Sequence, residues 1–471
     1  MRDLDRSGAR DECGVVAVYV PGEDAARLAY YALYALQHRG QESAGIAVSD
    51  QRSILVSKEM GLVSQVFDER KLVSLTGHLG IGHVRYSTTG SSTWDNAQPA
   101  FKVTPAGTGL ALGHNGNLTN TAELAAAHGE AARGCATDSD LLASTLADHR
   151  GPLDEALADV LTRVRGAWSL VVMDERAVHA ARDPFGVRPL VIGRLPQGGY
   201  IIASESAALD IVGAHFLRDV APGEIVSIDA TGFRTRRYAP ERSAFCAFEH
   251  VYLARPDHRD GQTSIYASRR RMGVALAREA PATADLVIPV PDSGTAAASG
   301  YSAASGIPYA EGLVKNRYVG RTFIEPSQAL RQLGIRLKLN PLRDVLEGQR
   351  LVVVDDSIVR GNTSRQLVRM LREVGVTEVH LRITSPPVRN PCFYGIDMAT
   401  PAELVASGLS VDEIRDFVGA DSLAYLSEEA LVAASQRPRE DLCMACFDGQ
   451  YPIPIPPQQT AAGDQLVMFD R

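Results

Sequence analysis

One stretch decides the fold of the C-terminal half of this 471-residue chain: Leu351-Val-Val-Val-Asp355-Asp356-Ser357-Ile-Val-Arg360-Gly361-Asn362-Thr363-Ser364. The apolar run predicts a buried strand, and the loop that follows its two carboxylates leads into a helix through Arg372. Leu286-Val-Ile-Pro-Val and Val379-His-Leu-Arg-Ile predict two further short strands. Strands that alternate with helices in this way are typical of βαβ units and a parallel sheet.

The loop after the first strand has the composition of a site for a sugar phosphate. Backbone N–H groups and the helix dipole at a helix N-terminus favour a dianionic phosphate, and Thr363 and Ser364 add hydroxyl donors. Asp355 and Asp356 suit two vicinal ribose hydroxyls or a Mg²⁺ ion, both of which prefer hard oxygen partners. The alternative is a strand end with solvated acids before a capped helix. A cap needs no second acid, Arg-Gly pair or hydroxyl cluster, so the stretch favours a binding site.

Two further segments fit the same substrate. A second strand–loop–helix pattern carries the loop residues Asp292, Ser293, Gly294 and Thr295, although any such turn favours these residue types. The segment from Lys315 to Asn340 concentrates cations in a chain whose formal net charge is -8. A pyrophosphate leaving group requires such a cluster, whereas the alternative is a solvated basic loop.

The long stretch resembles the signature of type I phosphoribosyltransferases, which bind 5-phosphoribosyl 1-pyrophosphate. The resemblance implies a loop for the 5′-phosphate that consists of Arg360, Gly361, Asn362, Thr363 and Ser364. It implies that Asp355 and Asp356 face the ribose hydroxyls and Mg²⁺. It further implies a pyrophosphate loop of Asp292, Ser293, Gly294 and Thr295, with Ser293 as another metal ligand, and a closing loop with Arg321 and Lys338. Asn362 stands where this family usually has Thr; because Asn still donates to phosphate, we expect tuned affinity and not lost activity.

The N-terminal half alternates short strands with few helices. Apolar or alternating runs bounded by turn residues predict strands at 14–20, 45–48, 54–57, 80–86, 109–113, 168–173, 189–193 and 200–204. Helices are predicted over 25–37, 138–148 and 153–165. This pattern favours stacked antiparallel sheets with helices on their outer faces. It ends between residues 235 and 260, where we place the boundary between two domains.

Cys13 heads the first strand, where a cysteine is usually only a small buried side chain. Four other segments are rich in Arg, Asn, Gly or Asp, a composition that is unsuited to a hydrophobic core: 36–45, 82–88, 113–118 and 137–140. In combination and in this order they resemble the class II glutamine amidotransferase domain, an N-terminal-nucleophile hydrolase, over residues 13 to about 235. The resemblance implies that residues 1–12 are a propeptide cleaved at Glu12–Cys13. The free α-amine that cleavage creates can activate the thiol as the local base.

The same resemblance assigns roles around glutamine. The Cys13 thiolate would attack the side-chain amide and form a γ-glutamyl thioester, while the Asn115 side chain and the Gly116 N–H form an oxyanion hole. Arg85 would bind the α-carboxylate of glutamine through a bidentate fork, and Asp138 its α-ammonium group. Arg39, Tyr86 and residues 87–96 are expected to form a gating loop over the pocket. The histidines His38, His83 and His114 receive no catalytic role.

Five of the six cysteines remain to be explained. From spacing alone, Cys443-Met-Ala-Cys446 fits a redox pair, half a zinc site or part of an iron–sulfur site. The sequences around Cys246 and Cys392, together with the terminal pair, resemble the iron–sulfur subgroup of amidophosphoribosyltransferases. That resemblance implies a structural 4Fe–4S cluster on Cys246, Cys392, Cys443 and Cys446, and it leaves Cys135 as an ordinary small residue.

Composition limits the remaining function classes. A chain that is 45% apolar and 22% charged is typical of a soluble globular protein, and its negative net charge argues against general nucleic-acid binding. The N-terminus lacks the apolar core of a signal peptide, and no apolar run is long enough to span a membrane. These features indicate a cytoplasmic protein in a reducing environment, where cysteines are more often catalytic or metal-binding than disulfide-bonded.

Residues 13 to about 455 as a whole resemble the amidophosphoribosyltransferase family. The resemblance implies an α/β fold with an N-terminal four-layer αββα glutaminase domain (13–240), a type I phosphoribosyltransferase domain (241–455) and a tail (456–471). It implies transfer of ammonia from glutamine to phosphoribosyl pyrophosphate through a transient channel, Mg²⁺ dependence, a homotetramer and feedback by purine nucleotides at or beside the substrate site. Two rivals remain: another class II amidotransferase, such as a glucosamine-phosphate or asparagine synthase, and a non-catalytic ligand-sensing regulator. The Asp355–Ser364 stretch disfavours the first, and the four glutamine-site segments disfavour the second.

Overall fold

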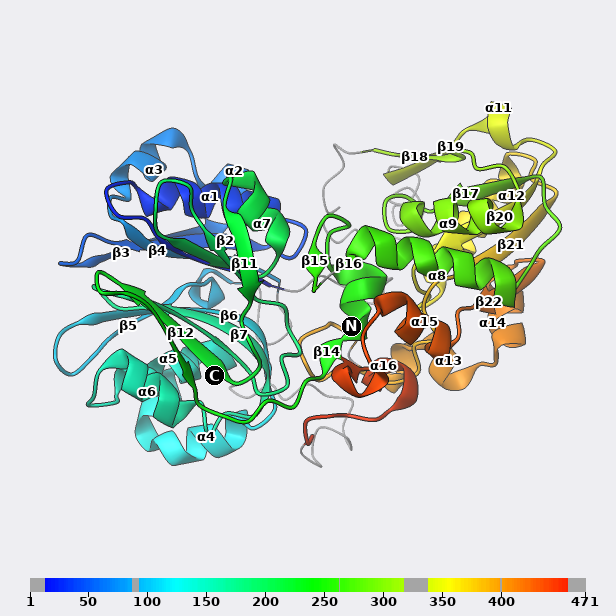
Figure 1. Ribbon diagram of the computed structural model, residues 1–471. Coiled ribbons are helices and arrows are strands. Elements are labelled where there is room, and N and C mark those ends of the chain that lie inside the picture. The colour runs from blue at the N-terminus through cyan, green and yellow to red at the C-terminus, as the bar shows by residue number, and fades with distance from the viewer. Residues whose placement is uncertain (1–12, 87–92, 262, 317–337, 399, 456–471) are drawn as a thin grey trace.

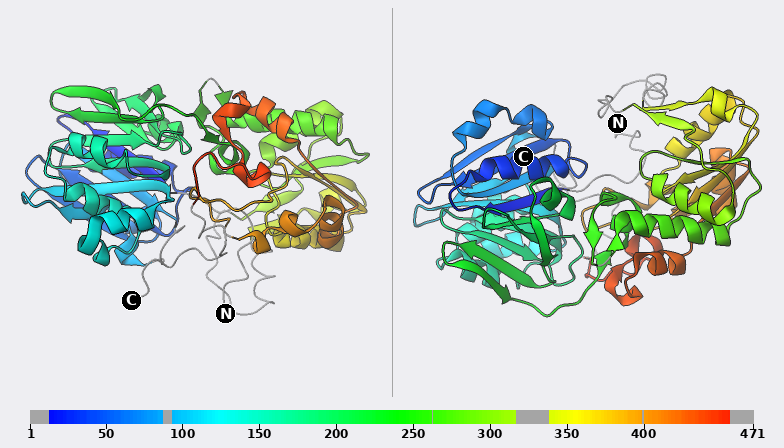
Figure 2. Two further views of the ribbon diagram at one scale, coloured as in Figure 1. Left: turned by 90° about the horizontal axis from the view of Figure 1, so that it is seen from below. Right: turned by 45° about the horizontal axis from the view of Figure 1, so that its top comes forward.

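A computed structural model describes residues 13–86, 93–261, 263–316, 338–398 and 400–455. Figures 1 and 2 agree that the N-terminal and C-terminal halves form two lobes that lie side by side. Among the described residues, no helix combines the length and apolar character that a bilayer crossing requires.

The N-terminal lobe contains two antiparallel sheets that pack face to face (Figure 1). The first has the strand order β11-β9-β10-β1-β4-β2-β3. Its strands are β1 (Gly14–Tyr19), β2 (Ser43–Ser49), β3 (Ile54–Met60), β4 (Leu79–Arg85), β9 (Val191–Arg194), β10 (Tyr200–Ala203) and β11 (His215–Asp219). The second has the order β13-β12-β8-β7-β6-β5. Its strands are β5 (Ala100–Val103), β6 (Gly109–Leu118), β7 (Gly166–Met173), β8 (Val178–Arg182), β12 (Glu224–Asp229) and β13 (Gly232–Arg237).

Helices cover the outer face of each sheet. The first sheet carries α1 (Ala25–Ala35), α2 (Val63–Val66), α3 (Glu69–Ser74) and α7 (Ser206–Ile211). The second carries α4 (Thr121–His128), α5 (Asp138–Ala147) and α6 (Leu153–Val160). Strand β1 is buried on both faces: Val16 and Val18 pack under α1, whereas Val15 and Ala17 face the second sheet. The predicted αββα arrangement is therefore confirmed.

The C-terminal lobe is built on a parallel sheet of order β17-β20-β21-β22, which confirms the fold predicted for this half. Its strands are β17 (Leu286–Pro289), β20 (Arg350–Asp355), β21 (Glu378–Ile383) and β22 (Ser422–Tyr425). Both faces are covered, because Leu351 and Val353 of β20 pack with α12 and α14, and Val352 and Val354 pack with α8 and α9. These helices are α8 (Ile265–Glu279), α9 (Thr295–Ser305), α12 (Asn362–Glu373) and α14 (Val411–Val418).

Short elements complete this lobe and its junction with the first. A parallel pair joins the start of the lobe to its end, and two antiparallel pairs lie elsewhere in it. The pairs are β14 (Phe245–Cys246) with β23 (Leu442–Cys443), β15 (Arg259–Asp260) with β16 (Thr263–Ser264), and β18 (Leu313–Lys315) with β19 (Leu339–Pro341). The other α-helices in the described part of this lobe are α11 (Arg343–Leu346), α13 (Val405–Gly408), α15 (Glu428–Ser435) and α16 (Ala445–Asp448).

Several predicted boundaries differ from the structure. The helix expected over 153–165 ends at Val160, and the strand expected over 189–193 begins only at Val191. Pro189 has no N–H to give to a sheet, which explains the later start. Strand β6 extends to Leu118, five residues beyond its predicted end, because β7 pairs with it along this whole length.

Candidate active sites

The residues expected to act on glutamine lie where the two N-terminal sheets meet. Cys13 directly precedes β1 and is 8% exposed, and its Sγ donates to the Tyr86 carbonyl at 3.4 Å. Because side chains alternate along a strand, Cys13 has the parity of Val15 and Ala17, which face the second sheet. On β6, Ala111 faces the same interlayer, so Asn115 has the inward parity as well. The nucleophile and the expected oxyanion donor therefore belong to facing strands.

The amide of Asn115 is the most unusual polar group of this region. Asn115 is 0% exposed, yet neither its Nδ2 nor its Oδ1 has a hydrogen-bond partner in the part of the chain that the structure describes. An unpaired buried amide is costly, so such groups in native proteins call for an explanation. The next residue, Gly116, has φ +143°, and a Cβ there would meet the Ala167 carbonyl oxygen at 2.0 Å. The chain can therefore hold only glycine at this position.

Asp138 begins helix α5 against the end of β6. Its Oδ2 accepts from the Leu118 N–H at 3.1 Å, and its Oδ1 accepts from the Ser139 N–H at 2.8 Å. These bonds hold the carboxylate beside the Asn115–Leu118 segment. Arg85, the last residue of β4, is 3% exposed, and its Nη1 lies 3.9 Å from Oε2 of Glu42. The structure thus gathers Cys13, Tyr86 and Arg85 at the first sheet and Asn115, Gly116 and Asp138 at the second.

Arg39, which is expected over the glutamine pocket, has a buried side chain. Its guanidinium is 1% exposed and pairs with the buried carboxylates of Glu205 and Glu249; Nη2 lies 2.6 Å from Oε2 of Glu249. The side chain is thus engaged in a cluster of buried charges between the lobes. The adjacent Gly40 packs against the backbone of β4. A Cβ at Gly40 would lie 2.7 Å from the Arg85 backbone nitrogen, so only glycine permits this close approach. Of the expected gating loop, residues 87–92 lie outside the described residues.

The three histidines in these segments have structural contacts. His83 Nε2 lies 3.0 Å from the His114 carbonyl, and His114 Nδ1 lies 2.9 Å from Ser139 Oγ. Burial lowers the pKa of His83 to about 3 and also lowers the pKa of His114, so both are neutral at pH 7. His38 pairs with Glu205 at 2.7 Å.

The two predicted sugar-phosphate loops lie side by side at the carboxyl edge of the parallel sheet. Pro289 of β17 pairs with Val354 of β20, and this register brings the loop from Asp292 next to Asp355 and Asp356. The Ser293 hydroxyl donates to Asp356 Oδ2 at 2.5 Å. A Cβ at Gly294 would lie 2.3 Å from the Val354 carbonyl oxygen, so only glycine permits this approach. Ligands of open α/β sheets bind at this edge.

The pKa values of both adjacent acids, Asp355 and Asp356, are raised. Burial, and then the neighbouring Asp356 carboxylate, raise the pKa of Asp355 well above its usual range. Burial likewise raises the pKa of Asp356, although the hydroxyls of Ser293 and Ser357 and the charge of Arg269 oppose the shift. Two adjacent carboxylates that resist ionising together form a site for a cation or for hydroxyl donors.

The expected 5′-phosphate loop turns directly into helix α12. Gly361 has φ +76° and precedes the helix, Asn362 and Thr363 form its exposed or half-exposed first turn, and Ser364 is buried. Thr295 begins α9 in the same way after Gly294. The Arg360 guanidinium donates to Glu403 Oε2 at 2.6 Å. The loop therefore presents a helix N-terminus, a hydroxyl and an amide together.

The basic segment is described only at its two ends. Lys315 Nζ lies 2.7 Å from Asp292 Oδ2, which brings one of its cations to the expected pyrophosphate loop. Lys338 is exposed and pairs through its carbonyl with the Asn316 N–H at 2.9 Å. Arg321 lies outside the described residues.

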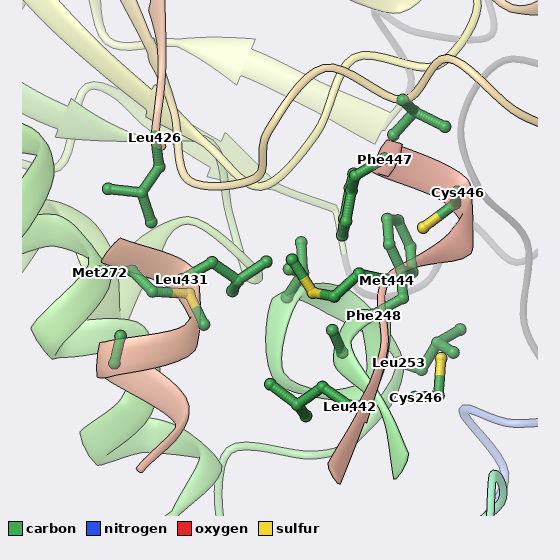
Figure 3. Packing of buried hydrophobic residues seen from close by; sticks show 14 of the residues in the cluster. Cys246, Phe248, Leu253, Met272, Leu426, Leu431, Leu442, Met444, Cys446 and Phe447 are labelled. Atoms are coloured by element: carbon green, nitrogen blue, oxygen red, sulfur yellow. The ribbon is translucent and has the colours of Figure 1, made fainter. Parts of the chain in front are cut away.

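The four expected cluster cysteines line one cavity. β14 and β23 pair in parallel with Cys246 opposite Cys443, α16 carries Cys446, and a loop brings Cys392 to the same cavity beside Tyr394 and Tyr451. Figure 3 shows Cys246 and Cys446 along one edge of the hydrophobic cluster. Burial, together with the neighbouring Cys392, raises the pKa of Cys443 to about 12, and burial and the other three thiols raise that of Cys446. Cys135 instead lies under α5 in the first lobe.

Sequence reasoning did not find the buried charges that join the lobes. Arg188 is 0% exposed and donates through Nε and Nη2 to the Tyr394 carbonyl at 3.0 and 2.6 Å. Its Nη1 lies 3.7 Å from Glu249, the partner of Arg39. Arg269, also buried, donates to the carbonyls of His250 and Ala254 near the acid pair. The sequence signal that could have identified these residues is a charged side chain within an otherwise apolar run.

Comparisons with known proteins agree with both sites. A family model described as a glutamine amidotransferase domain matches residues 83–210. An amidophosphoribosyltransferase from Mycobacterium bovis is 57% identical over 479 residues, which cover 99% of this chain and 90% of that protein. This chain belongs to the amidophosphoribosyltransferase family.

Solved structures of similar proteins support this membership. Glutamine phosphoribosylpyrophosphate amidotransferase from B. subtilis, complexed with ADP and GMP, has 43% sequence identity and a TM-score of 0.88, with 94% of this chain and 98% of that chain covered. A structure described as the allosteric regulatory enzyme of purine biosynthesis has 43% identity and a TM-score of 0.89, with 95% and 97% covered. As an amidophosphoribosyltransferase, the enzyme hydrolyses glutamine and transfers the ammonia to C1 of phosphoribosyl pyrophosphate. The products are 5-phosphoribosylamine, glutamate and pyrophosphate, and the reaction is the first committed step of de novo purine biosynthesis.

Proposed function

We propose that glutamine hydrolysis uses Cys13 as the nucleophile after removal of residues 1–12. The free α-amine of Cys13 takes the thiol proton, and the thiolate attacks the amide carbon of glutamine. The Asn115 amide and the Gly116 N–H stabilise the oxyanion, ammonia leaves, and water then releases glutamate from the thioester. The observation that carries this assignment is the buried Asn115 amide without a partner in the described chain, because a buried donor that the protein does not satisfy fits a charge that exists only during reaction.

We assign substrate orientation in this lobe to two opposite charges. Arg85 binds the α-carboxylate of glutamine, and Asp138 binds its α-ammonium group. Both side chains are at least nine-tenths buried, with 3% and 6% exposed, so their interactions with a charged substrate are only weakly screened by water. Tyr86 contributes the backbone carbonyl that already accepts from the Cys13 thiol.

For the second half-reaction, the two loops at the sheet edge hold phosphoribosyl pyrophosphate. The α12 N-terminus with Arg360, Gly361, Asn362, Thr363 and Ser364 binds the 5′-phosphate, and the loop of Asp292, Ser293, Gly294 and Thr295 binds the pyrophosphate. Asp355 and Asp356 face the ribose, and with Ser293 they would hold Mg²⁺. This donor set fits the ion, because Mg²⁺ usually takes one or two carboxylates and completes its shell with water and phosphate. The bound ion would neutralise charge on the departing pyrophosphate.

Basic residues complete the phosphoribosyl site. Lys315, which contacts Asp292, adds a cation at the pyrophosphate loop. Lys338 and Arg321 belong to the segment that would close over the substrate and complete a transient path for ammonia from the first site.

The four cysteines Cys246, Cys392, Cys443 and Cys446 would hold a structural 4Fe–4S cluster. All four line one cavity. Among the described residues, however, no three His, Cys, Asp or Glu side chains are grouped as ligands of a single ion. A cluster that binds each thiolate to a different iron needs wider spacing than one Zn²⁺ ion, whose sulfur ligands lie at about 2.3 Å. The cluster would tie the segment after the first lobe to the C-terminal end.

We also propose how the enzyme is regulated and assembled. The B. subtilis structure is a complex with ADP and GMP, and we propose that purine nucleotides inhibit this enzyme at or beside its phosphoribosyl site. We further propose a cytoplasmic homotetramer. Sedimentation of the purified protein with and without these nucleotides measures its assembly.

The experiment that tests the assignments is an anaerobic assay that follows glutamate and pyrophosphate in one tube. Glutamate release should rise when phosphoribosyl pyrophosphate and Mg²⁺ are added, and pyrophosphate should appear with it. Cys13→Ala should abolish both from glutamine but retain pyrophosphate release from ammonium salts. Cys135→Ala, at a buried thiol of the same lobe, serves as the matched control and should retain both. Glutamate release from Cys13→Ala would refute the nucleophile.

A further inference from the structure

One loop of the C-terminal lobe packs directly on the expected oxyanion hole of the N-terminal lobe. The Asn117 side chain on β6 donates through Nδ2 to the Phe393 carbonyl at 3.0 Å. Two residues further, a Cβ on Gly395 would lie 3.2 Å from both Cα and C of Gly116. The contact thus joins backbone to backbone, immediately beside Asn115 and Gly116.

The same loop is fixed from its other side. The buried Arg188 guanidinium donates twice to the Tyr394 carbonyl, at 3.0 and 2.6 Å, and lies 3.7 Å from Glu249. The Tyr394 hydroxyl donates to the Ile453 carbonyl at 2.7 Å and accepts from the Ile453 N–H at 3.0 Å. Each residue from Phe393 to Gly395 therefore contacts a specific residue of the N-terminal lobe.

These contacts fix the backbone of the Phe393–Gly395 loop at the lobe boundary. A buried guanidinium is costly to desolvate, and the two bonds from Arg188 to the Tyr394 carbonyl offset part of this cost while they hold that carbonyl in place. Gly395 has φ +112°, which residues with a side chain rarely adopt, so this conformation of the loop requires glycine. The backbone that these groups fix on the other side is that of Gly116, whose N–H would have to meet a developing oxyanion.

We propose that residues Phe393 to Gly395 are a positioning element for glutamine hydrolysis, supplied by the phosphoribosyl-transfer lobe. Gly395, held by Arg188 through Tyr394, sets the position of the Gly116 backbone, and Asn117 locks the register. This inference rests on the proposed assignment of Asn115 and Gly116 to the oxyanion hole. Its consequence is that the glutaminase site is complete only when the C-terminal lobe is seated against it.

Gly395→Ala tests the proposal with a matched control. The added methyl would push Gly116 by a few tenths of an ångström, and since a misplacement of about 1 Å can cost ~10²-fold in rate, we expect kcat for glutamine hydrolysis to fall about tenfold. The KM for glutamine should change little, because Arg85 and Asp138 do not move. Synthesis from ammonium salts, iron content and Cys13 alkylation by iodoacetamide should match the wild type. Gly232→Ala, at φ +117° with no atom within 4 Å, introduces the same backbone strain without the contact and should have wild-type kcat.

A second variant keeps the proposal testable if Gly395→Ala does not fold. Asn117→Ala removes the bond to Phe393, together with a longer 3.4 Å bond to the adjacent Leu118 carbonyl, and should lower the same kcat by about fivefold, again with ammonia-dependent synthesis unchanged. Wild-type kcat in both variants, or a parallel loss of both activities with iron, would overturn the proposal. Asn115→Ala in the same assay tests the oxyanion-hole assignment separately from the role of Gly395. If Asn115→Ala retains wild-type kcat, the oxyanion-hole assignment fails, and the role of Gly395 fails with it.

Discussion

The proposed glutamine site lies between two sheets, whereas the proposed phosphoribosyl site lies at the open edge of one. Asn115 and Arg85 are almost completely buried on strands, and glycines at 40 and 116 fit against neighbouring backbone. In the other lobe, Asp292, Thr295 and Asn362 are exposed on loops or on the first turn of a helix. The first site has donors fixed before the substrate arrives, and the second has charges that a cation and the substrate must balance. Covalent attack on a neutral amide needs the former, and departure of a polyanion needs the latter.

The largest expected effect separates the two sites through the acid pair. Asp355→Asn and Asp356→Asn should each lower 5-phosphoribosylamine synthesis by about 10²–10³-fold, from glutamine and from ammonia alike, because the metal and ribose contacts are lost. Glutamine hydrolysis without phosphoribosyl pyrophosphate should stay near wild type. Asp412→Asn on α14, whose side chain is 82% exposed, is the control in the same lobe. Intact ammonia-dependent synthesis in either variant would remove the acid pair from the site.

A smaller effect, which is confined to the rate of glutamine hydrolysis, is expected at Asn115. Asn115→Ala should lower kcat for glutamine hydrolysis by about 10²-fold while leaving the thermal midpoint nearly unchanged, because its amide makes no bond within the described chain. Asn120→Ala should do the reverse. Its Nδ2 donates to the Arg163 carbonyl and its Oδ1 accepts from the Arg165 N–H, both at 2.9 Å, so its loss costs stability and not rate. Equal effects of the two variants on kcat would contradict a prebuilt oxyanion hole.

The two lobes also differ in how much of their structure could be predicted from the sequence. Parallel strands bring their carboxyl ends to one edge, so the neighbourhood of Asp292 and Asp356 followed from local patterns alone. The first lobe depended on pairings that local patterns do not encode: β5, β8, β11, β12 and β13 were not predicted, and neither were the buried ion pairs of Arg39. Its partner Glu249 lies 210 positions away, and a polar motif cannot specify a contact at that distance. For the cysteines, spacing alone left zinc, redox and iron–sulfur roles open, and the β14–β23 pairing was needed to bring Cys246 opposite Cys443.

Acid should weaken the first lobe through its buried histidines. The pKa of His83 is about 3 in the folded protein, below the usual 6.5, because burial disfavours the charged ring. The unfolded state therefore binds an additional proton between these values, and stability is complete above pH 6.5 and falls as the pH drops towards 3. His83→Gln should reduce the loss between pH 6.5 and 5.5 by about 1 kcal/mol, measured as the pH dependence of unfolding. The exposed His215→Gln is the control; an unchanged slope in His83→Gln would mean that another group accounts for it.

The smallest effect is expected at the one departure from the family pattern. Asn362 is exposed on the first turn of α12, where an amide and a Thr hydroxyl can both donate to the 5′-phosphate. Asn362→Thr should therefore change the KM for phosphoribosyl pyrophosphate by less than about threefold, which is under ~0.7 kcal/mol, with kcat unchanged. Thr363→Val, which deletes a donor to a charged group, should raise that KM by about tenfold or more. A many-fold better Asn362→Thr enzyme would show that the open site, like the buried one, depends on the placement of a single donor, and the contrast between the two sites would then rest on the acid pair alone.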